Sequence, residues 1–353
     1  MVFPRGGRER ATPARPPWSA GSDTISINLA SILRGAGTAG ACLAISACNR
    51  HQSTLAPFGV EARDTRTLMI VLLVAAVVIA GGLTALIRFA IRTPGGRLTH
   101  RQGMRLVLWL GAVVPTILLF TLLVSELPAM RPLPVAPADL RVKVEGEQFW
   151  WRVTYAPPGQ APVVAANEIR IPVGRTVQFD LDGGDVIHSF WIPGLAGKMD
   201  MIPGRTNTLV ARATKPGRYR GVCTEFCGLS HALMAFDVVA MPAAAFDAWL
   251  TAERRPALAT ATAHPGAALF AQYGCGGCHA IRGTAQAGAI GPDLTRFGAR
   301  ATLAAGVLPM TTANIAGFVR HPERTKPGVR MPAFPQMTDA EAIRIARYLE
   351  GLK

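Results

Sequence analysis

Acidic residues are scarce in this chain. It has 22 Asp and Glu residues against 37 Lys and Arg, and its formal net charge is +15. That balance could indicate a nucleic-acid-binding protein, but the sequence has no glycine-rich phosphate loop and no platform of aromatic and basic residues. The basic residues cluster beside apolar runs instead. Membrane topology therefore explains the charge better, and we expect no nucleic-acid partner.

Cysteine is scarce too, with six residues in a chain of 353. Two of them belong to a C-x-x-x-C-x-x-x-H-x-x-M motif formed by Cys223, Cys227, His231 and Met234. Thiolate, imidazole and thioether donors select copper over magnesium or calcium, and the Met favours copper over zinc. The loop alone could form a mononuclear site, and a second His far upstream, His188, would complete a larger one. The alternative is a disulfide between the two cysteines.

A second pair of cysteines forms a C-x-x-C-H motif with Cys275, Cys278 and His279. This motif is the attachment signature of a c-type haem, because both thiols add to the haem vinyl groups and the adjacent His reaches the iron. A zinc or thioredoxin-like site is the alternative. It is disfavoured because no second Cys pair follows the motif.

Two helices are predicted to flank this second motif. Residues 266–273 precede it, and a final helix begins at Thr338, which forms a capping-box pattern with Glu341. The apolar positions of the final helix recur every three residues, as Ile343, Ala346 and Leu349. We expect this face to pack on the first helix.

Two long apolar runs predict membrane-spanning helices. They cover residues 68–87 and 106–124, close to the ~20 residues that cross the hydrocarbon core. Pro115 in the second run is tolerable within a membrane, where neighbours can satisfy the freed carbonyl. The connection between the runs contains five Arg and no acid, so it is predicted to be cytoplasmic, with both chain ends outside. The alternative of two buried core helices fits neither this length nor the basic loop.

The chain begins with a segment typical of export. Residues 1–34 are rich in Arg, Pro and Gly, and a modest apolar run of residues 35–47 follows. Its ending, Ile-Ser-Ala followed by Cys48, resembles a lipobox and predicts lipidation of Cys48. The alternative is an ordinary signal peptide with a spare Cys.

Short alternating strands separated by Gly and Pro follow from residue 140 to residue 241. Many short strands within about 100 residues predict a β-sandwich or barrel. Together with the metal-ligand pattern on a late loop, this region resembles a cupredoxin.

The copper-ligand pattern resembles the binuclear copper A centre of cytochrome c oxidase subunit II. The resemblance includes the Asp-Val-Ile-His-Ser-Phe-Trp segment around His188 and the Lys-Met-Asp-Met-Ile-Pro-Gly-Arg segment of residues 198–205. It implies bridging thiolates from Cys223 and Cys227, imidazole ligands from His188 and His231, and weak outer ligands from the Met234 thioether and the Glu225 carbonyl.

The same resemblance assigns two further roles. The Glu225 carboxylate would help to hold a magnesium or manganese ion at the junction with subunit I. The aromatic segment of Phe149, Trp150 and Trp151 resembles the family's electron-entry region, although Phe149 stands where the family has its first Trp. Alternatively, these rings only fill core and interface space. The second predicted membrane helix lacks the acid that the family often has near its cytoplasmic start.

The C-x-x-C-H region resembles a class I cytochrome c. Its Gly-Pro-Asp-Leu segment beginning at Gly291 implies that the Pro292 carbonyl orients His279. Met331, in a Met-Pro-Ala-Phe segment, resembles the sixth iron ligand of such cytochromes. Met310 and Met337 are the competing candidates, and we expect them to fill the core or a loop instead. A Met ligand would raise the haem potential.

The sequence therefore resembles subunit II of a caa-type cytochrome c oxidase with a fused cytochrome c domain. Its fold class is expected to be multidomain, with a two-helix transmembrane hairpin, a cupredoxin-like β-sandwich and an all-α cytochrome c domain. The predicted segments are a lipoprotein-type signal peptide (1–47), an exported N-terminal segment (48–66), the hairpin (67–127), the copper A domain (128–242), a linker (243–264) and the cytochrome c domain (265–353).

The resemblance implies that electrons enter through haem c and pass through copper A to the haem–copper centre of subunit I. There O2 would be reduced to water with proton translocation, which makes the chain part of a proton-translocating oxidoreductase. The implied partners are subunits I and III, and the implied donor is a cytochrome c or an upstream respiratory complex. The implied location is a bacterial inner membrane, with the redox domains outside. Tethering by a flexible linker would raise the effective concentration of the haem domain to the ~mM range.

Three other functions share parts of this pattern. A copper A nitric oxide reductase would have the same layout and a different acceptor. A quinol oxidase subunit II would lack the copper ligands, and a copper-handling lipoprotein would not need a haem motif. No cysteine remains for a structural disulfide if two bind copper, two bind haem, Cys48 carries lipid and Cys42 is cleaved off.

Overall fold

The computed structural model describes residues 49–92, 99–128, 138–157 and 159–353. It divides the chain into two units, residues 1–49 and 50–353, and the description below concerns the second. The predicted signal peptide and the lipidation at Cys48 lie outside the described residues. Residues 129–137, at the start of the predicted copper A domain, lie outside them as well.

Within the described ranges, two helices are long and apolar enough to cross a membrane. The first is α2 (Val60–Arg92), and the second is a continuous helical run made of α3 (His100–Leu108), a π-helical turn η1 (Trp109–Val113) and α4 (Val114–Glu126). Helix α2 begins before the predicted boundary at residue 67, because backbone hydrogen bonds within a helix persist past the apolar run. The π turn precedes Pro115, which lacks the amide hydrogen of a regular helix.

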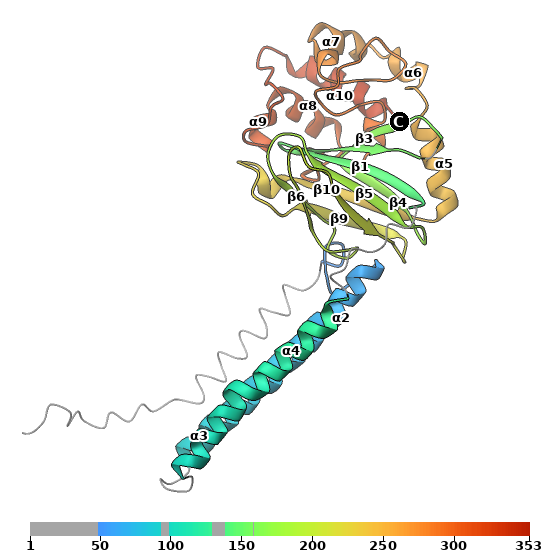
Figure 1. Cartoon of the computed structure of the whole chain (residues 1–353). Coiled ribbons are helices and arrows are strands. Elements are labelled where there is room, and N and C mark those ends of the chain that lie inside the picture. The colour runs from blue at the N-terminus through green and yellow to red at the C-terminus, as the bar shows by residue number, and fades with distance from the viewer. Residues whose placement is uncertain (1–48, 93–98, 129–137, 158) are drawn as a thin grey trace, which may run out of the picture. The chain divides into compact units, whose positions relative to one another are not determined.

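Residues 140–241 form the predicted β-sandwich of two five-stranded sheets (Figure 1). The first sheet has the order β3-β2-β1-β5-β8, and the second has the order β4-β10-β9-β6-β7. The strands of the first sheet are β1 (Leu140–Glu147), β2 (Trp150–Tyr155), β3 (Val163–Ala166), β5 (Val177–Gly183) and β8 (Asn207–Ala211). Those of the second are β4 (Glu168–Pro172), β6 (His188–Trp191), β7 (Met199–Met201), β9 (Gly217–Cys223) and β10 (Ala235–Met241).

The sandwich has an aromatic core between its two sheets. Strands β1 and β2 alternate buried and partly exposed side chains, which is the period expected when one face packs inward. Trp151 packs against Phe190 and Phe236, with ring centroids 5.9 and 4.9 Å away. Because β6 and β9 are antiparallel neighbours that pair Phe190 with Cys223, this core lies directly beside the copper-ligand segment.

The segment expected as a linker contains two helices. Helix α5 (Ala243–Glu253) places Phe246 and Leu250 in the sandwich core, and the Trp249 ring lies 5.1 Å from that of Tyr155. The short helix α6 (Ala259–Thr262) follows. The first part of residues 243–264 therefore packs on the sandwich.

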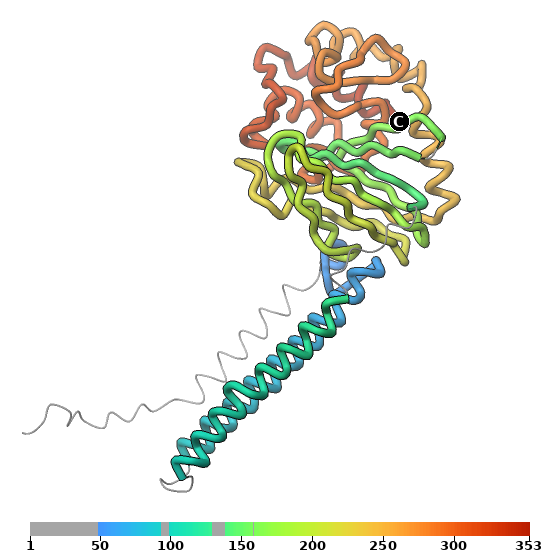
Figure 2. The backbone as a smooth tube through the Cα atoms, viewed as in Figure 1, coloured from blue at the N-terminus to red at the C-terminus, as the bar shows by residue number. Residues whose placement is uncertain are grey.

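The region after residue 265 is helical, as predicted (Figure 2). Its elements include α7 (Gly266–Gln272), η3 (Cys275–Gly277), η4 (Phe297–Ala299), α8 (Thr312–Arg320), α9 (Pro322–Thr325) and α10 (Asp339–Gly351). Two short strands, β11 (Thr302–Leu303) and β12 (Leu308–Pro309), pair with each other. Helix α10 begins with the predicted capping box of Thr338 and Glu341.

The predicted packing of the final helix is confirmed in one respect and wrong in another. Helix α10 packs on α7, with the rings of Tyr348 and Phe270 5.8 Å apart. Ile343, however, is 39% exposed, whereas Ala342 and Ile345 are buried with Ala346 and Leu349. A helix turns by about 100° per residue, so a spacing of three residues drifts away from one face and misplaces Ile343.

Candidate functional site

The structure brings all six predicted copper ligands into one cluster. Cys223 ends β9, His188 begins β6, and the loop from Glu225 to Met234 closes over them. The nitrogen and sulfur donor atoms of His188, Cys223 and Cys227 lie within 4.8 Å of one another. The pairing of β6 with β9 explains why residues 35 positions apart in sequence meet here.

The two thiols lie close to each other, and each has further donor atoms nearby. The Sγ atoms of Cys223 and Cys227 are 3.9 Å apart, and both cysteines are free, so they form no disulfide. The Cys223 Sγ also lies 3.9 Å from His188 Nδ1 and 3.2 Å from the Glu225 carbonyl oxygen. The Cys227 Sγ lies 3.6 Å from Nδ1 of His231 and 3.8 Å from the Met234 sulfur.

The electrostatics of the thiol pair favour a bound cation. Contact with Cys227 lowers the pKa of Cys223, and contact with Cys223 raises the pKa of Cys227. Two thiolates this close repel each other, so a second deprotonation needs a positive charge between them. A zinc–thiolate bond is ~2.3 Å long. Twice this length is more than the distance between the two sulfur atoms, so one metal ion can bind both of them. The donor set therefore fits soft metal ions shared by both sulfurs.

His188 is oriented by Asp185, a residue for which the sequence had suggested no role. The Asp185 Oδ1 atom lies 2.9 Å from His188 Nε2. Because a carboxylate accepts this hydrogen bond, Nε2 carries the proton and Nδ1 faces Cys223 with its lone pair. Burial lowers the pKa of His188, but its contacts with Cys223 and Asp185 outweigh burial and leave the pKa raised. The signal in the sequence was the spacing of three residues between acid and imidazole.

The segment before β2 contacts the ligand loop and His188 through hydrogen bonds and close packing. Gln148 donates from its side chain to the Cys227 carbonyl at 2.5 Å and from its backbone to Asp185 at 2.8 Å. A Cβ atom at Gly146 would lie 2.9 Å from the His188 ring, so only glycine allows this approach. Gly146 and Gln148 belong to the same segment as the aromatic residues 149–151, whose resemblance to the family the sequence shows. Their contacts with His188 and Cys227 were not predicted, because these partners are distant in sequence.

The three aromatic residues proposed for electron entry lie in different environments. Phe149 and Trp151 are buried, whereas Trp150 is partly exposed and has the Arg152 guanidinium 4.7 Å above its ring. The Trp151 ring lies 6.3 Å from the imidazole of His188. This geometry is compatible with either role suggested by the sequence.

Glu225 contributes its carbonyl to the cluster and directs its carboxylate outward. Its side chain is exposed, and the described residues place it in no group of three or more potential ligands. A magnesium or manganese site at this carboxylate would need ligands from another chain.

The C-x-x-C-H motif begins in a short 3-10 turn that follows α7. Cys275 and Cys278 are partly exposed free thiols, and burial raises the pKa of Cys275 to about 11. The His279 Nδ1 atom donates to the Pro292 carbonyl at 2.8 Å, which leaves Nε2 with a free lone pair. Burial lowers the pKa of His279, which keeps the imidazole neutral, as iron ligation requires.

The three methionines that compete for the sixth position differ in burial. Met337 is 1% exposed and belongs to the helical core. Met310 and Met331 are partly buried at its margin, and Met331 shares that margin with Cys275 and Phe334. Its burial thus makes Met337 a core residue, whereas Met310 and Met331 lie where they are partly accessible.

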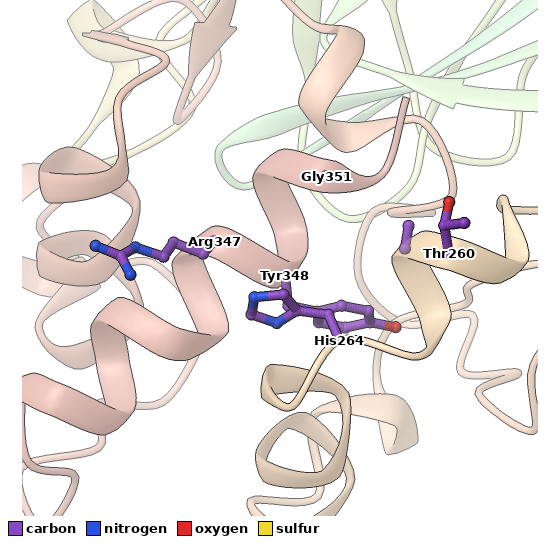
Figure 3. Close-up of a pocket in the computed structure, with 6 residues that line it drawn as sticks. Thr260, His264, Arg347, Tyr348 and Gly351 are labelled. Atoms are coloured by element: carbon purple, nitrogen blue, oxygen red, sulfur yellow. The ribbon is translucent and has the colours of Figure 1, made fainter.

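A separate cavity of about 240 Å³ lies beside α6 and α10 (Figure 3). His264 and Tyr348 stack there with ring centroids 6.4 Å apart. The lining residues are Thr260, Ala261, His264, Arg347, Tyr348 and Gly351. None of them is a predicted metal or haem ligand.

Comparison with known proteins defines the class of the chain. The family model described as "Cytochrome C oxidase subunit II, periplasmic domain" matches residues 159–241, and the one described as "Cytochrome c" matches residues 263–353. The fold and these two matches define a membrane-associated oxidase subunit with a fused cytochrome c domain.

Curated relatives extend the match to most of the chain. Cytochrome c oxidase subunit 2 of Alkalihalophilus pseudofirmus is 39% identical over 251 residues, which cover 68% of this chain and 71% of that protein. The Bacillus subtilis protein of the same name is 34% identical over 254 residues, which cover 68% of this chain and 70% of the relative. This chain belongs to the cytochrome c oxidase subunit 2 family.

A solved structure also matches part of the chain. The periplasmic domain of subunit II of cytochrome oxidase from Bradyrhizobium japonicum is 30% identical, with a TM-score of 0.33. The match covers 34% of this chain and 97% of that domain.

Proposed function

We propose that this chain is the electron-entry subunit of a proton-translocating oxidase. It would accept electrons at a covalently attached haem c and pass them through a binuclear copper centre to the haem–copper centre of subunit I, where O2 is reduced to water. The observation that carries the proposal is the convergence of six donor groups from β6, β9 and the following loop. A quinol-oxidizing relative would have no need of this cluster.

The proposed copper ligands are the thiolates of Cys223 and Cys227, the imidazoles of His188 and His231, the Met234 thioether and the Glu225 carbonyl. Once bound, the copper pair supplies one-electron transfer. The chain contributes a cage that changes little with oxidation state. Asp185 and Gln148 hold that cage from outside, and the burial of both thiols and Met234 excludes water.

The proposed haem attachment uses Cys275 and Cys278, with His279 as one axial ligand and Met331 as the other. The hydrogen bond from His279 to Pro292 fixes the imidazole orientation and supports this assignment. A thioether ligand from Met331 would raise the haem potential and favour donation to copper.

The proposed setting is a bacterial inner membrane with the redox domains on the periplasmic side. The two apolar helices support membrane anchoring, and the arginines beside them support a cytoplasmic connection. The proposed domain boundaries, lipidation at Cys48, entry through Phe149, Trp150 or Trp151, and a divalent ion at Glu225 belong to the same proposal. So do subunits I and III as partners and a cytochrome c or respiratory complex as donor.

Spectroscopy of the full-length chain tests this function directly. The chain is purified in detergent after expression with haem maturation and copper loading, beside a Cys227→Ser variant and a Met199→Leu control. We expect a low-spin c-type haem spectrum and a seven-line copper hyperfine pattern from one electron shared by two coppers. The variant should lose the seven-line pattern, and the control should keep it. A four-line signal or no bound copper in the unmodified chain would contradict the proposal.

A further inference from the structure

A short stretch of the haem domain lies against the copper-ligand loop. This docking segment, Lys326–Arg330, connects α9 with Met331. Ser230, which adjoins His231, is fully buried and donates its hydroxyl to the Pro327 carbonyl at 2.7 Å. Arg330 lies 3.1 Å from the Asp185 carboxylate, the group that orients His188. These contacts therefore connect the segments that carry the proposed copper ligands with the segment that carries Met331. The residues that make the contacts lie only one or a few positions from a proposed ligand.

Lys326 is the most buried polar group of the docking segment. It is 2% exposed, and its ammonium donates to the backbone carbonyl of Phe149 in the copper domain. No carboxylate pairs with it among the residues that the structure describes. An amine so deeply buried is costly unless it is hydrogen-bonded, so the docked copper domain supplies the partner that compensates the burial.

Gly328 lets the two domains approach closely. Its φ of +78° lies in the left-handed region, and a Cβ atom there would be 3.2 Å from the Leu229 side chain and 3.6 Å from the Phe149 ring. A side chain at this position would meet both strain and crowding. The docking segment is thus matched to the copper domain in shape as well as in hydrogen bonding.

A second set of contacts lies away from the metal loops. Ala235 donates its backbone amide to the Ala305 carbonyl at 3.1 Å, and Arg220 donates to the Gly306 carbonyl at 3.0 Å. The Thr302 hydroxyl donates to the Asp237 carboxylate at 2.6 Å. These contacts engage β9 and β10, so the haem domain is attached at two separate places.

We infer that the docking segment holds the haem domain in one fixed position on the copper loop, with Lys326 as its principal positioning residue. This inference rests on the proposed function for its meaning, because electron tunnelling slows steeply with distance. The haem domain would act as a docked partner of the copper site and not as a carrier swinging on a flexible tether. The copper-domain surface formed by Phe149, Ser230 and Asp185 would then be closed to a separate redox protein.

Hydrogen–deuterium exchange of the full-length chain in detergent tests the inference. Two variants disrupt the contact by different means: Lys326→Gln replaces the buried ammonium by a shorter, uncharged amide that does not reach the Phe149 carbonyl in the same way, and Gly328→Leu adds bulk at the contact. Their matched controls are Arg324→Gln, which removes an exposed charge two residues away, and Gly174→Leu. Gly174 has a similar φ of +84°, but nothing lies within 4 Å of its Cβ position.

We expect residues 146–151 and 226–233 to be protected in the unmodified chain and in both controls. Exchange there should rise about tenfold in Lys326→Gln and Gly328→Leu, because leaving a buried hydrogen-bonding group such as the Phe149 carbonyl without its partner typically costs about that factor. Exchange in β5 and α10 reports on folding of each domain and should stay unchanged. If Gly328→Leu also exposes those elements, Lys326→Gln alone decides.

The inference is overturned if Lys326→Gln exchanges like Arg324→Gln, or if the unmodified chain lacks protection in both regions. These measurements do not use the copper spectrum. A chain without a binuclear copper signal but with protected segments would defeat the proposed function and leave the docking intact, and the opposite result would defeat only the docking.

Discussion

The Oδ1 atom of Asp185 lies 2.9 Å from Nε2 of His188. The other oxygen of the same carboxylate accepts from the Gln148 backbone amide at 2.8 Å and lies 3.1 Å from the Arg330 guanidinium. One carboxylate therefore connects a proposed copper ligand, the segment before β2 and the docking segment of the haem domain.

Replacing Asp185 by Asn should weaken copper retention by roughly 10- to 100-fold, as is typical when a group orienting a metal ligand is lost. An amide has one acceptor oxygen and cannot accept from both His188 and Gln148 in the same way. Competition with a copper chelator measures the change. Asp182→Asn is the control, because the Asp182 side chain makes no hydrogen bond or ion pair among the described residues. Equal copper retention in the two variants would contradict the role of Asp185.

Gly291→Ala should disturb haem ligation by His279. A Cβ atom at Gly291 would lie 2.6 Å from Cε1 of the His279 ring, so the imidazole would have to move. We expect loss of the low-spin haem spectrum in the variant. Gly317→Ala is the control, since nothing lies within 4 Å of its Cβ position. A low-spin spectrum retained in Gly291→Ala would show that the iron does not depend on this ring position.

Methionine variants should identify the sixth ligand. Met331→Leu is expected to lower the haem midpoint potential, because thioether ligation raises it. Met310→Leu should leave the potential unchanged. Met337→Leu should affect only stability, by less than about 1.5 kcal/mol, because it conserves volume in a buried site. Redox titration of the three variants makes the measurement, and a drop confined to Met310→Leu would transfer the role to that residue.

The stability of the chain should depend on pH through Lys326. Burial lowers the pKa of Lys326 to about 7, against an ordinary value of 10.5. Between these values the unfolded chain binds more protons, so the free energy of unfolding rises with pH, by at most about 1.4 kcal/mol per unit for one group. Below pH 7 both states are protonated, and this contribution is constant.

Thermal unfolding of the full-length chain between pH 7 and 9 measures this dependence. The unmodified chain should gain stability relative to Lys326→Gln as pH rises. Arg324→Gln should follow the unmodified chain, because this variant keeps Lys326 and its contact with Phe149. A difference between Lys326→Gln and the unmodified chain that does not change with pH would contradict the prediction.

Several features of this protein could be predicted from its sequence because they depend on local chemistry. Both ligand motifs, the β-sandwich and the capping box at Thr338 depend on nearby residues or on regular periodicity. The apolar runs likewise identify helices suited to a membrane by length alone. Ile343 shows the limit of periodicity, because a spacing of three residues does not follow one face of a helix.

The sequence by itself determined which donor atoms are present, because a motif records residue type and spacing. Only the tertiary structure decided which groups orient them. Gln148 and Lys326 reach their partners across 79 and 177 residues of sequence. Such contacts leave no local pattern, since the stabilisation comes from burial and geometry that arise only when distant segments pack together.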